Sequence, residues 1–152
     1  MTSQRLSVHD VDPKAYQAVI GLERYVRNSG LDPRLYELVK IRASQLNGCA
    51  FCLDMHARDA RAQGEDQRRL DVLSAWPEAP SLFTERERAA LAFTEAVTRI
   101  GEAGVPDPVW AELIRCFDEA EVVALLMAVS TINIWNRLAV STHQQLPALD
   151  RA

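Results

Sequence analysis

Helix-start signals recur through this chain, and they restrict its possible folds more than any other feature of the sequence. In three places an aspartate that can cap a helix precedes a proline suited to the first helical turn: Asp12-Pro13, Asp32-Pro33 and Asp107-Pro108. Thr84 and Glu87 have the spacing of a capping box. No segment shows the apolar-polar alternation of a half-buried strand. The sequence therefore predicts an all-α protein.

Apolar residues follow helical spacing after each start signal, and glycines mark several of the helix ends. The expected helices cover residues 13–30, 33–47, 49–63, 66–75, 84–100, 107–117 and 118–141. A proline-rich loop is expected at 76–81. No repeat and no low-complexity tract divides the chain. We predict one all-α domain, residues 1–152, with six to seven helices.

Composition and charge exclude several classes of function. Hydrophobic residues make up 48% of the chain and charged residues 25%, as in a soluble globular protein. The net charge of -4 gives no reason to expect nucleic acid or an anionic membrane as a partner. The longest apolar-rich run, Val122–Trp135, is shorter than the roughly 20 residues that span a bilayer. Because the N-terminus lacks a signal peptide, we expect a cytoplasmic, reducing location.

A pair of cysteines followed by a histidine carries the strongest chemical signal. At 100° per residue, helical geometry places Cys52 and His56 within about 60° of Cys49 on one stripe. Cys52 and His56 are i,i+4 neighbours, and Cys49 lies at the start of the helix, where free N–H groups favour a thiolate. We interpret this arrangement as a redox-active dithiol with its own base. The third cysteine, Cys116, lies beside Phe117 on an apolar helix face, which indicates a core position.

Glu37 gives two conflicting signals. It shares the polar side of its helix with Lys40 and Ser44, which favours a solvated glutamate. If the chain reverses at Asn47-Gly48, however, Glu37 lies about 15 Å from the turn and His56 about 12 Å, at 1.5 Å per residue. The carboxylate and the imidazole could then meet, and the sequence leaves both interpretations open.

Two other functions fit the same residues. Cys49, Cys52 and His56 are suitable zinc ligands, and a fourth ligand could come only from a few residues: His9, His143 or Glu37. No second C-x-x-C or H-x-x-H supports such a site. The other alternative is a redox-sensing or purely structural oligomer. No glycine-rich nucleotide-binding motif occurs, so a nucleotide cofactor is not supported. We expect no cofactor and no bound metal.

The spacing Glu-x11-Cys-x-x-Cys-x3-His, from Glu37 to His56, resembles the signature of the AhpD-like alkylhydroperoxidases within the carboxymuconolactone decarboxylase superfamily. The surrounding Leu-Val-Lys-Ile-Arg-Ala-Ser-Gln-Leu-Asn-Gly-Cys and the Thr-Ile-Asn-Ile-Trp-Asn-Arg-Leu of residues 131–138 are also similar to the family. The resemblance implies an all-helical homo-oligomer, a trimer or a hexamer. It also implies hydroperoxide reduction without metal, flavin or haem, and recharging by a dithiol or thioredoxin-like reductant. One departure is Phe51, where the best-studied members carry a histidine between the cysteines.

The expected mechanism follows the resemblance and assigns four catalytic residues. Glu37 and His56 form a proton relay, Cys52 attacks the peroxide, and Cys49 closes the disulfide. We assign the attack to Cys52 because it is the direct helical neighbour of His56, although Cys49 has the better helix-terminus position. Four residues of the last helix are left outside the catalytic set: Asn133, Trp135, Asn136 and Arg137.

Overall fold

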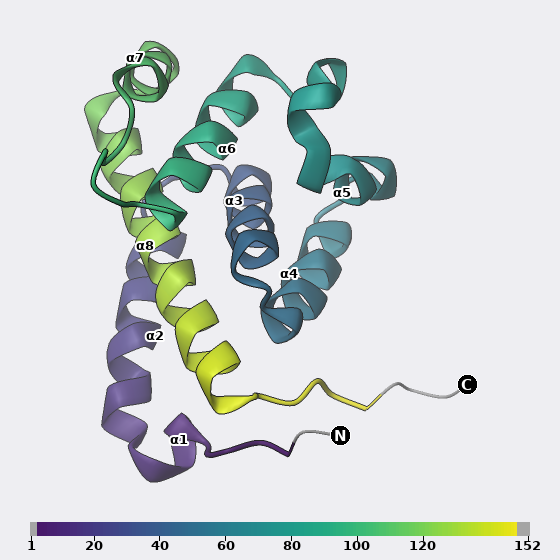
Figure 1. The fold of residues 1–152 in the computed structure, drawn as a ribbon, viewed down its shortest axis with the longest axis vertical. Coiled ribbons are helices and arrows are strands. Elements are labelled where there is room, and N and C mark those ends of the chain that lie inside the picture. The colour runs from purple at the N-terminus through teal and green to yellow at the C-terminus, as the bar shows by residue number, and fades with distance from the viewer. Residues whose placement is uncertain (1–2, 149–152) are drawn as a thin grey trace.

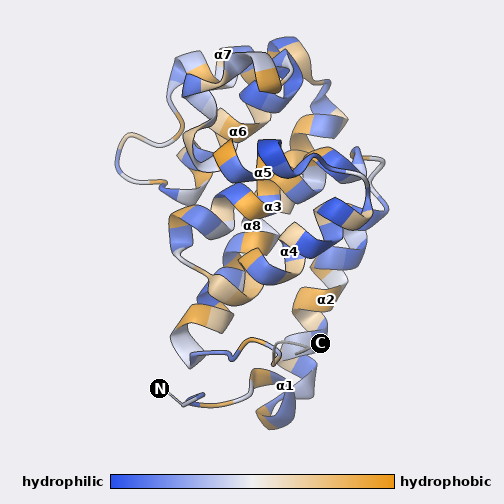
Figure 2. Ribbon diagram, turned by 90° about the vertical axis from the view of Figure 1, so that its right-hand side faces the viewer, coloured by the Kyte–Doolittle hydropathy of each residue, from blue (hydrophilic) through white to orange (hydrophobic). Residues whose placement is uncertain are grey.

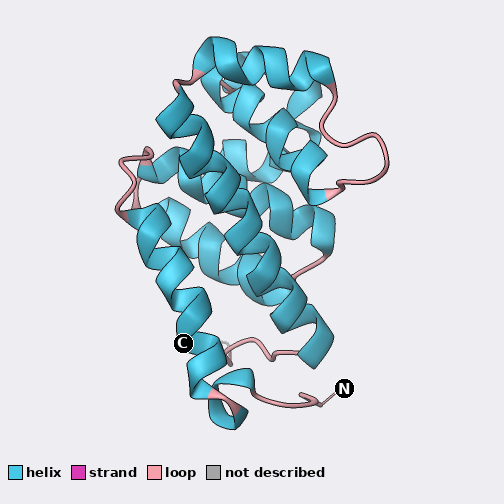
Figure 3. Ribbon diagram, turned by 90° about the vertical axis from the view of Figure 1, so that its left-hand side faces the viewer, coloured by secondary structure: helices cyan, strands magenta, loops and turns pink. Residues whose placement is uncertain are grey.

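The structure is a computed structural model that describes residues 3–148, and within that range it contains helices and loops but no strand (Figures 1 and 3). The α-helices are α1 (Val8–Val11), α2 (Pro13–Arg27), α3 (Pro33–Asn47), α4 (Ala50–Ala62), α5 (Gln67–Val72), α6 (Glu85–Thr98), α7 (Asp107–Cys116) and α8 (Glu119–Thr142). Two 3₁₀ helices, Leu73–Glu78 and Pro80–Leu82, lie between α5 and α6. The prediction of an all-α protein is confirmed.

Local capping fixes where the main helices begin. The Asp12 carboxylate accepts hydrogen bonds from the backbone N–H groups of Lys14 and Ala15 at 3.0 and 3.1 Å. Asp32 caps α3 in the same way, through the N–H of Leu35 at 2.8 Å. Complete capping boxes open α6 and α8. These side chains satisfy N–H groups that have no partner within the helix, so the starts are set locally.

The structure corrects the predicted elements in three places. Asp107 was expected to cap a helix that begins at Pro108, but it is the first residue of α7, and this helix has no side-chain cap. The structure has eight α-helices among the described residues rather than six or seven, because Ser7 caps a four-residue helix, α1, that no apolar period announces. The segment predicted as a proline-rich loop forms the two 3₁₀ helices instead, and the helix expected at 66–75 ends at Val72. Short helices of this kind bury few side chains, so periodicity could not reveal them.

Helix α3 lies at the centre of the fold. It packs against α4, α6 and α8, and α8 also packs against α2 (Figure 1). The largest core cluster joins buried side chains of α2, α3, α6 and α8, and Figure 2 shows hydrophobic and hydrophilic residues alternating along these helices. As a result α3 is buried on its polar side as well as on its apolar side. Glu37, Lys40 and Ser44 are 4%, 0% and 0% exposed.

Helix α8 is the longest element and the one described helix that is long and apolar enough to cross a bilayer by length and composition. More than half of its most apolar window is buried against the rest of the protein, as expected for a core helix. Its C-terminal end meets the N-terminal segment, where the N–H of Arg5 donates to the carbonyl of Thr142 at 2.8 Å. This end of α8 also lies beside the cysteine pair.

Candidate functional site

A tight turn between α3 and α4 positions the cysteine pair. Gly48 ends α3 in the left-handed region, at φ 64°, which glycine adopts without a Cβ clash. Cys49 then caps α4, and its Sγ accepts the backbone N–H of Cys52 at 3.4 Å. Both cysteines are buried, at 1% and 2% exposure, and both are free thiols. The turn therefore places one sulfur at the N-terminus of α4 and the other one turn further along.

The two thiols share one negative charge unequally. A hydrogen bond from the Cys52 thiol, the backbone N–H groups of Cys52 and Phe51, and Asn136 together outweigh burial and lower the pKa of Cys49 to about 7. The same thiol–thiol hydrogen bond, burial and the charge on Cys49 raise the pKa of Cys52 well above its ordinary value. When the pair of thiols loses its first proton, the negative charge lies on the sulfur of Cys49, at the N-terminus of α4.

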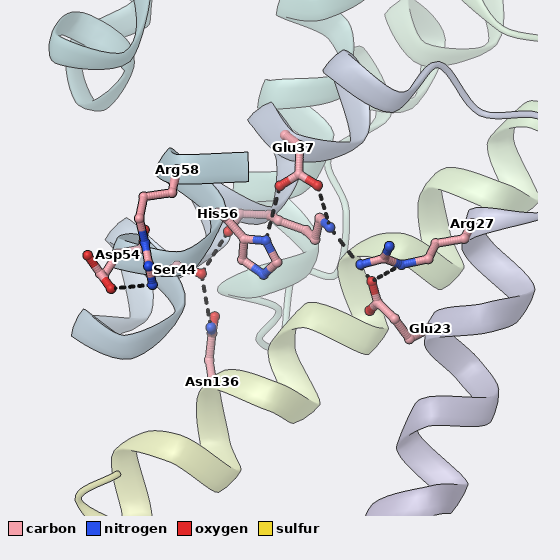
Figure 4. A network of polar contacts seen from close by, with 9 residues as sticks. Glu23, Arg27, Glu37, Ser44, Asp54, His56, Arg58 and Asn136 are labelled. Carbon is pink, nitrogen blue, oxygen red and sulfur yellow. Dashed lines mark hydrogen bonds and ion pairs between the residues drawn. The ribbon is translucent and has the colours of Figure 1, made fainter. Parts of the chain in front are cut away.

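Glu37 and His56 meet inside the protein. The Nδ1 atom of His56 lies 3.0 Å from Oε2 of Glu37, as Figure 4 shows, and both side chains are almost completely buried. Of the two interpretations that the sequence leaves open, the solvated glutamate is wrong, and the carboxylate meets the imidazole. Because a carboxylate accepts at Nδ1, that nitrogen carries the proton and Nε2 is left as the basic atom.

A buried lysine forms an ion pair with the same glutamate, and the sequence prediction does not assign it to the site. Lys40 Nζ lies 2.8 Å from Oε1 of Glu37, 3.6 Å from Oε1 of Glu23 and 3.8 Å from the centre of the Tyr36 ring. Glu23 in turn pairs with Arg27 at 3.3 Å (Figure 4). Burial raises the pKa of the Glu37 carboxyl, but the His56 hydrogen bond and the Lys40 charge outweigh burial, so the pKa lies below its usual value. Glu37 is therefore held as a carboxylate.

On the other side of the thiols lies a network of neutral side chains, which we call the amide network. Asn136 Nδ2 donates to Ser44 Oγ at 3.0 Å, and its Oδ1 accepts from Asn47 at 2.8 Å. Asn47 also donates to Asn133 at 2.9 Å, and Asn133 donates to Thr98 at 3.0 Å. Hydrogen bonding from Asn136 contributes to the lowered pKa of Cys49 and offsets part of the rise in the pKa of Cys52. The site predicted from the sequence does not include Asn136, although an asparagine within an apolar helix is a usable signal.

Each of the two cysteines lines a different cavity. The first, which we call the imidazole cavity, has about 230 Å³ and is lined by both polar and apolar side chains: Tyr16, Ile20, Glu23, Arg27, Phe51, Cys52, Met55, His56, Trp135 and Gln144. The second, which we call the Cys49 cavity, has about 270 Å³ and lies beside the C-terminal end of α8. It is lined by residues from the start of α4 and the end of α8: Gly48, Cys49, Ala50, Phe51, Ala139, Val140, His143, Gln144 and Gln145. Cys52 and His56 therefore share a cavity that Cys49 does not line.

Cys49 and Cys52 are in hydrogen-bond contact, yet only Cys52 lines a cavity together with His56. Cys49 precedes the first residue of α4 and has an extended backbone, with φ -89° and ψ 94°. Its side chain therefore does not follow the 100° helical spacing on which the prediction relied. Cys52 and His56 lie within the helix and do follow it.

The donor atoms that come together differ from the ligands of the alternative zinc site. Among residues 3–148, the group of three donors within 4.8 Å of one another is Glu37, His56 and Asp59, and it contains no sulfur. Lys40 and the His56 Nδ1 contact occupy the two carboxylate oxygens of Glu37. A cation there would compete with an ammonium that is already buried, so the donor set fits a metal poorly.

Known proteins resemble this chain over nearly its whole length. The uncharacterized protein YdfG of Bacillus subtilis is 38% identical over 139 residues, which are 91% of this chain and 94% of that protein. A solved structure from Agrobacterium tumefaciens, described as a protein of unknown function proposed to be the antioxidant defence protein AhpD, superposes with a TM-score of 0.93. It is 41% identical and covers 97% of this chain and 100% of its own.

A more distant structure shares the fold alone. An uncharacterized peroxidase-related protein from Silicibacter superposes with a TM-score of 0.79 at 21% identity, covering 90% of this chain and 72% of its own.

The sequence model of the carboxymuconolactone decarboxylase family matches residues 13–96, a range that contains Glu37, both cysteines of the pair and His56. The chain therefore belongs to the carboxymuconolactone decarboxylase family and has an AhpD-like structure.

Proposed function

We propose that this protein is a thiol-dependent peroxidase that reduces hydrogen peroxide or organic hydroperoxides through Cys49 and Cys52. The observation that carries the proposal is the position of Cys52 in the imidazole cavity with His56, whose Nδ1 is held by a buried carboxylate. A free dithiol, a histidine with a free Nε2 and a cavity for the substrate are the components that such a reaction needs.

In the proposed mechanism His56 Nε2 takes the proton of Cys52, and the Cys52 thiolate attacks one oxygen of the peroxide. The O–O bond breaks, Cys52 becomes a sulfenic acid, and the leaving alkoxide or hydroxide takes the proton from His56. Cys49 then attacks the Cys52 sulfur, water leaves, and the Cys49–Cys52 disulfide forms. Glu37 stabilises the imidazolium between the two proton transfers.

The two cysteines have complementary advantages in this mechanism. Cys49 carries the resting thiolate, whereas Cys52 shares a cavity with the base. We assign the attack to Cys52 because the peroxide must receive a proton as its O–O bond breaks, and His56 can supply it there. The Cys52 proton can move to His56 or to the neighbouring Cys49 thiolate.

Thiol titration tests the proposal directly. One equivalent of hydroperoxide added to the reduced protein should remove two thiols, those of Cys49 and Cys52, and leave Cys116 reduced. Cys116 lies on α7, outside the cluster that contains the pair. Peptide mapping identifies the oxidised residues. An unchanged thiol count, or Cys116 in the disulfide, contradicts the proposal.

Single cysteine variants test the assignment of roles. Cys52→Ser should abolish peroxide consumption, whereas Cys49→Ser should consume about one equivalent and stop as a sulfenic acid on Cys52. A dimedone-type probe and mass spectrometry locate the sulfenic acid. Trapping it on Cys49 in the Cys52→Ser protein would reverse the two roles.

We also propose that the chain forms a homo-oligomer and that a dithiol or thioredoxin-like protein recharges it. Exposed apolar side chains on two helices support self-association: Trp110 and Ile114 on α7, and Val123 and Leu126 on α8. Each pair shares one helix face by its spacing. Light scattering after size exclusion should give a trimer or a hexamer, and a monomeric mass would refute this part of the proposal.

A further inference from the structure

The disulfide that forms in the proposed peroxidase reaction has one sulfur on each of two cavities. Resting on that proposed function, we propose that the reducing dithiol approaches through the Cys49 cavity and attacks Cys49, with His143 as the base for the incoming thiol. Hydroperoxide and reductant then use different openings of the protein.

The linings of the two cavities support this separation. Cys49 lines the cavity at the end of α8, and Cys52 lines the imidazole cavity. Phe51 and Gln144 line both cavities, so they lie at the boundary between them. The rim of the Cys49 cavity includes Val140, which is 43% exposed, so the cavity can be reached from solvent. A thiol that enters here meets Cys49 first.

His143 has an unusual backbone conformation at this cavity. It ends α8 in the left-handed region, at φ 55° and ψ 46°, and among residues 3–148 it is the one non-glycine residue with a positive φ. A non-glycine residue pays an energetic cost for this conformation, and such costs occur often at functional sites. The conformation places the histidine in the lining of the Cys49 cavity. An imidazole there can accept the proton of an incoming thiol.

The electron and proton balance of the reaction is complete. A dithiol loses one proton to His143, and its thiolate attacks Cys49 Sγ while the Cys49–Cys52 bond breaks. The Cys52 sulfur leaves toward the imidazole cavity, where His56 can protonate it. The second thiol of the reductant then displaces Cys49. The reductant ends as a disulfide, and its two protons end on the two cysteine sulfurs, through the imidazoles and solvent.

A mapping experiment tests the site of attack without using peroxide. The protein is oxidised with diamide, freed of reagent, mixed briefly with 2-mercaptoethanol, quenched with acid and alkylated. Fragment mass spectrometry then shows which cysteine carries the mercaptoethanol. We expect the adduct on Cys49, and an adduct on Cys52 would overturn the proposal. Because diamide replaces the peroxide, this result is independent of whether the protein is a peroxidase.

Matched tryptophan variants separate the two openings. Val140→Trp should slow reduction of the diamide-formed disulfide by dithiothreitol at least about tenfold, because the larger side chain misplaces the incoming thiol. Ile20 lines the imidazole cavity. Ile20→Trp should therefore slow oxidation of the thiols by hydroperoxide and leave the reduction of the disulfide by dithiothreitol unchanged. Ile100→Trp, at an exposed position after α6 that lines neither cavity, is the control and should change neither rate. Equal effects of Val140→Trp and Ile20→Trp on reduction would overturn the proposal.

The role of His143 is tested with asparagine, which tolerates the left-handed conformation better than other non-glycine residues. His143→Asn should slow reduction by dithiothreitol at pH 7 by about 10²-fold, the lower end of the range for general acid–base catalysis. Raising the pH should restore the rate, because the thiol then ionises without a base. A rate at pH 7 equal to that of the unchanged protein would remove His143 from the proposal.

Discussion

The two halves of helix α3 bury polar side chains of opposite character on the same stripe. Toward its start, Glu37 and Lys40 form ion pairs that reach His56 and Glu23. Toward its end, Ser44 and Asn47 belong to the neutral amide network that reaches Asn136. The spacing of these four residues places them on one side of the helix. Hydrogen bonds from Asn136 and Ser44 connect this second set to the thiol pair.

The difference between these halves separates two tasks. A buried charge fixes the protonation state of its neighbours, and here Lys40 keeps Glu37 ionised so that it can stabilise an imidazolium. A neutral amide donates hydrogen bonds without adding a counter-charge, so Asn136 can favour a thiolate and still allow the thiolate to lose its charge on oxidation. We therefore expect charged-half variants to change the proton chemistry and amide-half variants to change mainly the sulfurs.

Glu37→Gln should give the largest effect on activity. If Glu37 supports His56, peroxide reduction should slow by about 10²–10⁴-fold, the range of general acid–base catalysis. The pH at which the cysteine thiolate forms should also rise, because a neutral glutamine no longer favours imidazolium. Rates of peroxide reduction and of cysteine alkylation across pH measure both effects. Superimposable alkylation curves with unchanged turnover would remove Glu37 from the site.

Lys40→Met should give the largest loss of stability. The change leaves Glu37 buried without its cation, and breaking a buried ion pair in this way costs about 3–5 kcal/mol. Urea unfolding measures the free energy. The double variant with Glu37→Gln should cost less than the sum of the two single changes, because no uncompensated carboxylate remains. Additive losses would mean that the two side chains do not act as a pair.

Asn136→Ala should have a smaller effect, concentrated on the sulfurs. Ser44 and Asn47 each lose a hydrogen-bond partner, so the protein should lose about 1–3 kcal/mol of stability, and the thiolate should form at higher pH. Asn133→Ala is the matched control, because it removes hydrogen bonds to Asn47 and Thr98 within the same network. The control should lose stability while its alkylation curve stays unchanged. If both variants shift the curve equally, Asn136 has no special relation to the thiols.

The smallest expected effect is a dependence of stability on pH in the reduced protein. The pKa of Cys49 is about 7 in the folded protein and 9.0 ordinarily, so the folded state favours the thiolate. The Cys49 thiolate contributes fully to the stability of the folded protein above about pH 9, and this contribution is lost as the pH falls toward 7. The raised pKa of Cys52 acts in the opposite direction, but only above its ordinary value of 9.0. Urea midpoints of the reduced protein should therefore rise from pH 7 to 9, and Cys49→Ser should flatten that rise.

The helix starts and the cysteine pair with its histidine could be predicted from the sequence because both depend on neighbours a few residues apart. Asp12, Asp32, Thr84 and Asp118 cap the helices through N–H groups two or three residues further along, whatever the rest of the fold is. Cys52 and His56 share a cavity because both lie inside one regular helix. The spacing from Glu37 to the turn also predicted that its carboxylate could reach the height of His56.

Tertiary packing decided which of these polar residues are buried and what they contact. Periodicity could not show that α3 is enclosed on its polar side, because the enclosing helices come from distant segments of the chain. Glu23 of α2 and Asn136 of α8 reach the two halves of that stripe from opposite ends of the sequence. The sequence by itself determined the dithiol, its nearby histidine and the local helix ends. Only the tertiary structure set the ionisation of Glu37, the burial of Lys40 and the separation of the two cavities, because each depends on contacts between helices far apart in the chain.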